Sequence, residues 1–547
     1  MKLNKLQEEA VESSSQNNLI IAGAGTGKTT VIVNRLLYLL ENETPPERIM
    51  LLTFSKKAAI EMVDRVMERS LTFQKNYSGT FHSVGLKIIK DYNLLENPIL
   101  LDEVLEMKIF KDVAKEFELK DDYIKPFFEQ IKKMKMNGLF WDEIVVDSKN
   151  YIEKLLKGVY KRYQEVLAEN NLIDYEDMLL LVIKKMKSDK DFLQELTQNF
   201  DHILIDEFQD SSFLQFNFLK EFVQGNSDIN IFAVGDDDQS IYSFRDSKIE
   251  NILNFHNYFK NSNIIKLKIN YRSNKKIIKF ANNLIKYNSY RYEKSLLPFK
   301  QEEGIVELNI YFDRAEEYAA ILDKILLWRY EHNDINNIVI LLKYNYQIDI
   351  LNSFLTESGI ETTTSNQTRV DKDIVLDIIN IFKSFSSDSE ILKEYAQTVL
   401  TKYDESLFLD DFDKNSYPYE IIEMVLNRLD NNETKNYLID ICKDFYTIEE
   451  FLLNEDRFIP NNEGVKIYTY HAVKGLQFDY VIMPYLEKES FLMKNSNIEE
   501  DRRVFYVGVT RAKEKLSFSY SKTTSKYGNI QYNTVLPFLN EGNSYFT

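Results

Sequence analysis

The apolar positions along the chain follow two rhythms. In short runs such as Asn18–Ile21 and Arg48–Phe54 most residues are apolar, whereas longer stretches place apolar residues three or four positions apart. Continuous runs are typical of strands buried on both faces of a parallel sheet, and longer periodic stretches are typical of helices. Residues 1–85 alternate between the two, which predicts a parallel sheet with flanking helices, and residues 86–173 predict a helical insertion.

The alternation of strands and helices returns from about residue 174 and again in the second half, with strands expected near Ile305–Ile310 and Asn337–Leu342. A mostly helical, acidic stretch interrupts this second half. The chain is therefore predicted to be an α/β protein with two lobes of parallel sheet, each carrying a helical insertion. The expected boundaries are 1–85 and 174–265 for the first lobe, 86–173 for its insertion, 266–385 and 456–547 for the second lobe, and 386–455 for a short second insertion.

The composition limits the classes of protein that the chain can be. With 547 residues and 44% hydrophobic content, it can bury several cores. A single cysteine, Cys442, excludes internal disulfides, no run of ~18 apolar residues occurs, and Met1–Asn4 does not resemble a signal peptide. We therefore expect a soluble cytoplasmic protein without a membrane partner. The net charge of −18 argues only weakly against nucleic acid, because binding depends on the local field of a groove.

A glycine-rich segment, Ala22–Thr29, lies between an apolar run and a helical stretch. Glycines in such a turn let backbone N–H groups converge on phosphate oxygens, while Lys28 supplies a cation and Thr29 offers a hydroxyl to Mg²⁺. Ala22 stands where the strict phosphate-loop pattern has its first glycine, and a chance match in a surface turn is the alternative. The flanking strand and helix favour a site for a nucleoside triphosphate, with its phosphates held by Ala24, Gly25, Thr26, Gly27, Lys28 and Thr29.

Polar side chains follow two further apolar runs. Asp206 and Glu207 end the run His202–Ile205, and at the carboxyl edge of a parallel sheet they would face the nucleotide. Asp206 is placed to hold Mg²⁺ through its water shell, and Glu207 to polarise the water that attacks the γ-phosphate, although a polar turn is the alternative. After the next strand, Gln239 can put an amide beside the γ-phosphate and sense its presence.

Two arginines complete the charges that phosphoryl transfer needs. Arg272 and Arg511 each follow a strand-like segment in the second α/β half. Guanidinium groups donated from a neighbouring domain stabilise the charge that builds on the phosphate oxygens. Each arginine alone would be read as a surface or helix-cap residue, but their joint placement favours a role in catalysis.

Ten short motifs occur in one order along the chain: Leu3–Gln7, Ala22–Thr29, Leu52–Ala59, Gly79–Ser83, Leu172–Asp177, Ile205–Asp210, Val234–Arg245, Asn270–Ser273, Tyr470–Asp479 and Glu500–Ala512. This ordered set resembles the UvrD–Rep–PcrA family of superfamily 1 DNA helicases. The resemblance runs from Gln7 to Arg511 and is loose between about 275 and 463. It implies two RecA-like P-loop lobes with ATP and Mg²⁺ bound between them.

The resemblance also implies roles for single residues. Gln7 would read the adenine edge, Tyr271 would stack on the base, and Gly475 would lie close to the nucleotide. Gln477 occupies a position that is usually Glu and contacts the nucleotide sugar. For the aromatic residues Phe54 and Phe244, core packing is the alternative to stacking on bases. The residues implied to contact DNA are Thr53, Phe54, His82, Tyr242, Phe244, Arg245, Thr469 and His471.

The function implied by the resemblance is ATP-driven movement in the 3′→5′ direction along single-stranded DNA, with unwinding of tailed duplexes. A second hypothesis is a nucleic-acid-gated ATPase switch that senses DNA ends and activates a partner nuclease without processive unwinding. The short second insertion motivates it, because the trimmed plan is similar to compact UvrD-like proteins that accompany a nuclease in Gabija-type antiviral defence. A plain DNA-binding module with a degenerate ATP site is the third alternative.

Overall fold

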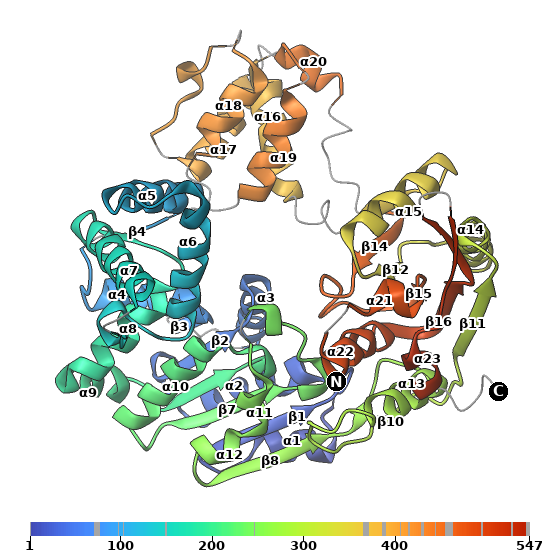
Figure 1. Cartoon of the computed structure of the whole chain (residues 1–547), viewed down its shortest axis with the longest axis horizontal. Helices are drawn as coiled ribbons and strands as arrows, with labels where there is room; N and C mark the ends of the chain where they lie inside the picture. Colours follow the sequence, from blue (N-terminus) through green and yellow to red (C-terminus); the bar gives the residue numbers. More distant parts are fainter. Residues whose placement is uncertain are drawn as a thin grey trace. The chain divides into compact units, whose positions relative to one another are not determined.

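The structure is a computed structural model (Figure 1), and it divides into two compact units that we describe separately. The first unit runs to Glu303 and also includes Ser496–Tyr506 and the segment from Glu541; the second begins at Gly304 and includes Val507–Asn540. The residues that the structure describes are 2–69, 77–96, 98–101, 103–147, 150–245, 247–364, 371–385, 390–404, 406–413, 416–427, 432–443, 445–454, 463–493, 496–526 and 529–542.

A parallel sheet of six strands forms the centre of the first unit, in the order β3-β2-β6-β7-β1-β8. The expected strands at the phosphate loop and at the carboxylate pair are both part of this sheet, separated only by β7. The strands are β1 (Asn17–Ala22), β2 (Ile49–Thr53), β3 (Tyr77–Thr80), β6 (His202–Ile205), β7 (Asn230–Gly235) and β8 (Ser262–Leu267).

Both faces of this sheet are covered by helices. Along β1, Leu19 and Ile21 pack into one core and Ile20 into the other, as expected for a strand buried on both faces. The helices α1 (Lys5–Val11), α2 (Lys28–Glu41) and α3 (Lys56–Met67) contribute to the core that contains Ile20. The opposite core is formed by α4 (Phe81–Asp91), α8 (Asp177–Ser188), α9 (Lys190–Gln198), α10 (Phe213–Gly225), α11 (Ile249–Leu253) and α12 (Phe255–Tyr258).

The expected helical insertion contains α5 (Glu103–Glu116), α6 (Asp121–Met136) and α7 (Tyr151–Glu169), which share a core of their own. Its first expected residue, 86, lies inside α4, whose apolar side chains pack on the sheet instead. The two short strands β4 (Ile99–Leu100) and β5 (Leu172–Ile173) pair in parallel and bring the ends of the insertion together.

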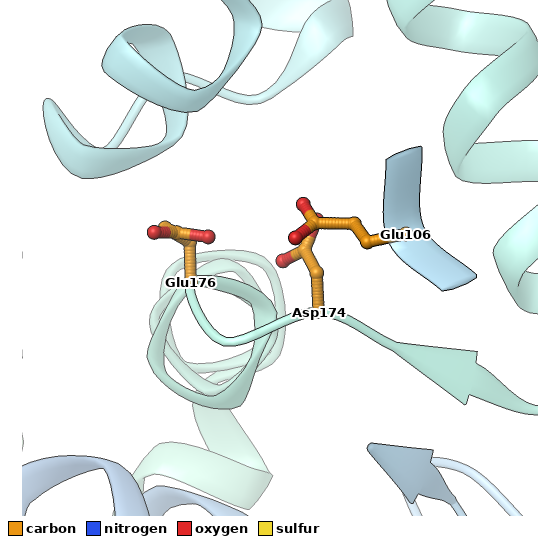
Figure 2. Close-up of side chains that lie close together, drawn as sticks. All are labelled: Glu106, Asp174 and Glu176. Carbon is orange, nitrogen blue, oxygen red and sulfur yellow. The ribbon is translucent and has the colours of Figure 1, made fainter. Parts of the chain in front are cut away.

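A buried ionic cluster fastens the insertion helices to the segment that leads into α8. Lys135 on α6 is fully buried and donates to Asp174 and, at 2.9 Å, to Asp177. Glu106 on α5 and Glu176 complete the group, and Figure 2 shows their carboxylates beside that of Asp174. Burial, and then the charge of Asp174, raise the pKa of Glu176 to about 7. Lys132 pairs with Glu106 at 2.7 Å, so two lysines lie among the four carboxyl groups of this cluster.

A second parallel sheet of six strands forms the centre of the second unit, in the order β11-β16-β15-β12-β14-β13. Helices α14 (Arg314–His332) and α15 (Asn345–Glu357) pack on it. The predicted fold class, parallel sheets with flanking helices and helical insertions, is thus confirmed. The strands are β11 (Ile305–Tyr311), β12 (Ile338–Leu342), β13 (Thr362–Thr364), β14 (Val465–Thr469), β15 (Phe478–Met483) and β16 (Ala512–Ser521). Outside the sheet lie the short helices α21 (Lys488–Phe491) and α23 (Pro537–Gly542), and β17 (Thr523–Lys526) pairs with β18 (Asn529–Tyr532) as a hairpin.

Among the described residues between β13 and β14, five helices share a separate apolar core: α16 (Lys372–Phe385), α17 (Glu390–Tyr403), α18 (Pro418–Val425), α19 (Asn432–Cys442) and α20 (Ile448–Leu452). We expected this insertion to begin at residue 386. However, Val375, Ile378 and Phe382 recur at helical spacing on α16 and are buried in this core, so the helical group already begins with α16. Among the described helices, none has the length and apolarity needed to span a membrane.

Residues 266–303 group with the first unit, although we expected them in the second lobe. The physical reason is that β8 ends at Leu267 inside the first sheet and the chain then stays beside it. This segment contains β9 (Ile269–Asn270), α13 (Lys275–Ile285) and β10 (Leu297–Pro298). Conversely, α22 (Ile498–Val509) begins in the first unit and ends in the second. The four-part division of the sequence remains a prediction.

Candidate functional site

The phosphate-loop segment has the strand–turn–helix geometry that the sequence predicted. β1 ends at Ala22 and α2 begins at Lys28, with Gly27 as the residue that precedes its first turn. Gly25 and Gly27 have φ of +68° and +87°, a region that favours glycine. The first N–H groups of a helix have no partner within it, so the start of α2 offers donors to an anion.

Three successive carbonyls of this loop accept hydrogen bonds from outside it. Asn270 Nδ2 donates to the Ala24 oxygen at 2.7 Å, and the Tyr271 amide donates to the Gly25 oxygen at 2.9 Å. Gln7 Nε2 donates to the Thr26 oxygen at 3.0 Å. The shape of the loop is thus fixed by α1 on one side and by Asn270–Tyr271 on the other, before any ligand binds.

Both ends of the Gln7 amide are used within the protein. Its Oε1 accepts from the Asn4 amide at 3.0 Å, which completes the cap of α1, and its Nε2 holds Thr26. Asn4 in turn donates to the Tyr271 hydroxyl at 2.7 Å. The structure therefore gives Gln7 a part in holding the phosphate loop, and its expected reading of the adenine edge stays a prediction, as does the stacking of Tyr271 on the base.

Asp206 has the features expected of a metal ligand. Its Oδ1 atom is buried and has no hydrogen-bond partner among the described residues. Burial, and then the neighbouring Glu207, raise the pKa of Asp206 to about 7, while Lys28 lowers it. A buried carboxylate oxygen without a hydrogen bond is costly unless a cation or water binds it. Asp206 and the Thr29 hydroxyl in the first turn of α2 thus suit Mg²⁺, which prefers oxygen ligands.

Glu207, the expected general base, has an unusual backbone conformation. Its φ of +49° lies in the left-handed region, which costs a residue other than glycine on the order of 1 kcal/mol or more. Its half-buried carboxylate accepts from Gln209 Nε2 at 2.6 Å. Gln209 itself is fully buried, and its Oε1 accepts from the Asp236 amide at 2.9 Å. Glu207 is therefore held in a fixed position next to the loop that follows β7.

That loop, Asp236–Gln239, carries three buried aspartates. Asp236 accepts from Gln239 Nε2, which orients the amide expected to sense the γ-phosphate. All three carboxylates contact Lys294 Nζ, at 3.1, 2.6 and 2.7 Å from Asp236 to Asp238. Arg291 adds a bidentate pair with Asp238 at 2.7 Å. The sequence reasoning missed both cations, although three consecutive buried acids require buried counter-charges.

The two expected catalytic arginines have different surroundings. Arg272, in the first unit, interacts electrostatically with Glu207; burial lowers its pKa to about 10, so it stays charged at neutral pH. Arg511 lies in the second unit directly after α22 and is 1% exposed. It donates to the Val507 and Leu476 oxygens at 2.9 and 3.3 Å, and to the Thr510 hydroxyl. Its expected role at the phosphates remains a prediction.

The other nucleotide candidates of the second unit are exposed. Gly475 has φ of +86°, and a β-carbon built on it meets no atom within 4 Å. Gln477 is exposed, in the segment before β15. Thr469, at the end of β14, is half-buried and accepts from the Ala472 amide at 3.2 Å, and His471 lies half-buried in the following turn. The roles expected for these four residues stay predictions.

Three aromatic side chains expected at DNA lie together in the first unit. Phe54 and Tyr242 are stacked, with ring centroids 5.1 Å apart and an angle of 19° between the planes. Tyr242 lies 5.8 Å from Phe244, which is 63% exposed. Thr53 is only 1% exposed and donates to the Ser55 oxygen. The expected contact of Arg245 depends on a side chain outside the described residues.

His82 stacks on a residue that the sequence reasoning left without a role. Its half-buried ring lies 3.8 Å from that of Tyr175, centroid to centroid, and Tyr175 is 52% exposed. Burial lowers the pKa of His82 to about 3, so the imidazole is neutral at physiological pH. Its expected contact with DNA stays a prediction. The signal in the sequence that we did not use is the aromatic residue Tyr175, directly after Asp174 in the motif Leu172–Asp177.

Comparisons with known proteins agree with the motif order. The UvrD/REP helicase N-terminal domain matches residues 3–260, and the UvrD-like helicase C-terminal domain matches residues 265–408 and 389–523. The ATP-dependent DNA helicase Rep of Buchnera aphidicola subsp. Schizaphis graminum is 30% identical over 656 positions, which cover 99% of this chain and 96% of that protein. DNA helicase II of Escherichia coli (strain K12) is 27% identical over 629 positions, with 98% and 87% covered. Because the alignment with Rep is longer than the 547 residues of the chain, Rep has more than 100 positions without a counterpart here.

Proposed function

We propose, because the chain belongs to the UvrD/Rep family of DNA helicases, that it hydrolyses ATP to move 3′→5′ along single-stranded DNA and to separate duplexes. The observation that carries the proposal is the buried Oδ1 atom of Asp206 at the end of β6, beside Glu207 and Lys28; within the part of the chain that the structure describes, this atom has no hydrogen-bond partner. Such an atom suits a cation that arrives with a ligand. The relatives named above are called DNA helicases, which supports DNA as the polymer.

The chain's own residues suit the binding of Mg²⁺-ATP. The N–H groups at the start of α2 and the Lys28 ammonium would hold the phosphates, and Asp206 and Thr29 would hold the metal. When bound, Mg²⁺-ATP supplies the phosphoryl group and a cation that offsets its charge. The preformed hydrogen bonds to Ala24, Gly25 and Thr26 support this assignment, because a loop that is already ordered loses little entropy on binding.

Glu207 suits the role of general base, since its carboxylate is oriented by Gln209 and remains half-exposed to an attacking water. Arg272 suits the stabilisation of phosphate charge because it stays protonated beside Glu207. Gln239 suits a sensor of the γ-phosphate because Asp236 orients its amide. The proposed role of Arg511 rests on its match to the family motif alone.

The stacked pair Phe54 and Tyr242 and the exposed Phe244 suit the binding of DNA bases by stacking, which does not depend on the base sequence. Stacking on such faces is worth about 1–3 kcal/mol per base. Tyr242 and Phe244 follow Gln239 within a few residues, so movement of the γ-phosphate sensor would be passed directly to the bases. The 3′→5′ direction is proposed from the family resemblance.

The proposal is tested by measuring ATP hydrolysis by the purified chain with single-stranded DNA, duplex DNA and RNA in parallel. We expect the strongest stimulation by single-stranded DNA, and strand displacement on duplexes with a 3′ tail but not on those with a 5′ tail. Hydrolysis that no nucleic acid stimulates would refute the proposal, and unwinding from 5′ tails would refute its direction.

A second candidate is a nucleic-acid-gated ATPase switch that signals to a partner without processive unwinding. One observation favours it, namely the more than 100 positions of Rep that have no counterpart in this chain. Neither the family models nor the relatives named here point to a partner nuclease or to a role in defence, so those expectations stay predictions. Robust strand displacement by the isolated chain would exclude the switch.

A further inference from the structure

Gln209 joins the loop after β6, which carries Glu207, to the loop after β7, which carries Asp236 and Gln239. It does so through both ends of its buried side-chain amide. Its Nε2 donates to Glu207 Oε2 at 2.6 Å and to Asp210 Oδ2 at 3.2 Å. Its Oε1 accepts from the Asp236 amide at 2.9 Å, and its backbone oxygen accepts from the Ser240 hydroxyl at 3.3 Å. The side chain is fully buried, so no water replaces these bonds when the amide is removed.

The residue opposite Gln209 is a glycine for a steric reason. A β-carbon on Gly235, the last residue of β7, would lie 2.7 Å from Gln209 Oε1 and 3.2 Å from its backbone nitrogen. Ile252 Cδ1 would lie at 2.9 Å from the same β-carbon. A side chain at position 235 would therefore collide with the Gln209 amide, which fills the space between the two loops.

The network continues from Asp236 to the expected sensor. Asp236 donates its backbone N–H to Gln209 Oε1 and accepts from Gln239 Nε2 at its carboxylate Oδ2. Its Oδ1 atom pairs with Lys294, which prevents the carboxylate from turning toward another donor. A displacement of the Gln239 amide is therefore passed through Asp236 and Gln209 to the Glu207 carboxylate without an intervening flexible group.

We infer that Gln209 is a positioning residue that couples the occupancy of the γ-phosphate position to the orientation of Glu207. The polarity of the amide is essential, since its N–H group must meet a carboxylate while its oxygen meets an N–H group. The hydrogen bond from Gln209 to Glu207 is important because the backbone of Glu207 is held in the left-handed region, which residues other than glycine disfavour. The inference deepens the proposed function and rests on it.

The test uses Gln209→Leu, which keeps the volume but removes all three hydrogen bonds of the side chain. We expect kcat for DNA-stimulated ATP hydrolysis to fall about 100-fold, as for a misplacement of about 1 Å, while KM for ATP changes less than about threefold. Gly235→Ala should reproduce the loss, because its β-carbon displaces the Gln209 amide from the opposite side. A change in KM alone, or a kcat within about twofold of the parent, would overturn the inference.

Two further variants separate positioning from loss of structure. Gln347 is another buried glutamine, which bonds to the Lys343 and Tyr344 amides in the second unit. Gln347→Leu should lower the melting temperature without changing kcat. If Gln209→Leu does not fold, Gln209→Asn keeps the amide but shortens it by one methylene, so that it reaches only one of its partners, and kcat should again fall with KM unchanged.

A double-variant comparison tests the coupling itself. If Gln209 acts between Gln239 and Glu207, then Gln209→Leu combined with Gln239→Ala should be slower than the worse single variant by less than about threefold. Losses that multiply would show independent roles and would overturn the inference. A parent chain without DNA-stimulated hydrolysis would instead refute the proposed function, so the two failures are distinguishable.

Discussion

A β-carbon on Gly25 would lie 2.7 Å from Asn270 Nδ2, so the phosphate loop and a segment 246 residues from it are fitted to each other. The β-carbon built on Gly25 would also lie 2.8 Å from the β-carbon of Arg272. Asn270 also accepts from the Arg272 amide at 2.9 Å, which holds the arginine at the loop. The loop that is proposed to bind phosphate and Arg272, which is proposed to stabilise the charge on that phosphate, therefore both depend on contact with Asn270.

Replacing Gly25 by alanine should weaken ATP binding by at least about tenfold, since crowding against Asn270 adds to a positive-φ strain of about 1 kcal/mol. Equilibrium titration with a fluorescent ATP analogue measures the effect. Gly359→Ala is the matched control, because Gly359 has φ of +78° but open space around it. Its affinity for ATP should equal that of the parent. Parent-like binding by Gly25→Ala would contradict the fitted contact.

Lys294→Met should lower the free energy of unfolding by about 3–5 kcal/mol, the usual cost of removing one partner from a buried ionic group. The ammonium is buried among Asp236, Asp237 and Asp238, which together raise its pKa well above the ordinary value although burial lowers it. Urea unfolding measures the change. Lys443→Met removes an exposed pair with Asp440 and should leave the midpoint unchanged. Equal effects of the two substitutions would contradict the proposed importance of burial.

The contribution of Glu176 to the stability of the first unit should decrease as pH rises from about 4.5 to about 7. Burial, and then Asp174, raise the pKa of Glu176 from 4.5 to about 7, so the folded state binds a proton that the unfolded state releases in this range. Glu176→Gln should therefore flatten the dependence of unfolding free energy on pH, measured by urea titration at several pH values. Glu129→Gln, at an exposed site on α6, is the control. An unchanged slope in Glu176→Gln would contradict this account.

Tyr242→Ala should weaken the binding of single-stranded DNA by about 1–3 kcal/mol at fixed salt, since it removes one stacking face and leaves Phe54 without its partner. Fluorescence anisotropy with a labelled oligonucleotide measures the affinity. Tyr330, 88% exposed on α14, provides the control substitution Tyr330→Ala, which should have no effect. Similar losses in both variants would show that exposed tyrosines bind DNA without a defined site.

The parts of the site that the sequence predicted are those encoded within a few residues. Lys28 and Thr29 follow the strand and glycine turn that place them, and Asp206 and Glu207 directly end an apolar strand. In each case local periodicity and turn chemistry were sufficient to predict the position of the residue, while its role at the nucleotide stays a prediction. The same holds for the positions of strands that are short apolar runs, such as β1, β2, β7 and β12, but not for β3 (YSGT) or β13 (TTT), whose sequences carry no apolar run.

Contacts between distant segments could not be predicted in the same way. Lys294 pairs with Asp237 57 residues away, and Gln7 holds Thr26 from another element. Neither pairing leaves a periodic signal in the sequence. The grouping of Arg272 with the first unit also depends on where the chain turns after β8, which propensity does not indicate. Tertiary packing decided these features.

The most direct test of the account measures steady-state ATP hydrolysis by Glu207→Gln with saturating single-stranded DNA. Glu207 is the group oriented by Gln209, beside Asp206 and Arg272, so its amide variant should still bind ATP with the affinity of the parent. We expect kcat to fall by at least about 100-fold, as for loss of a general base. Hydrolysis at the parent rate by this variant would contradict the account.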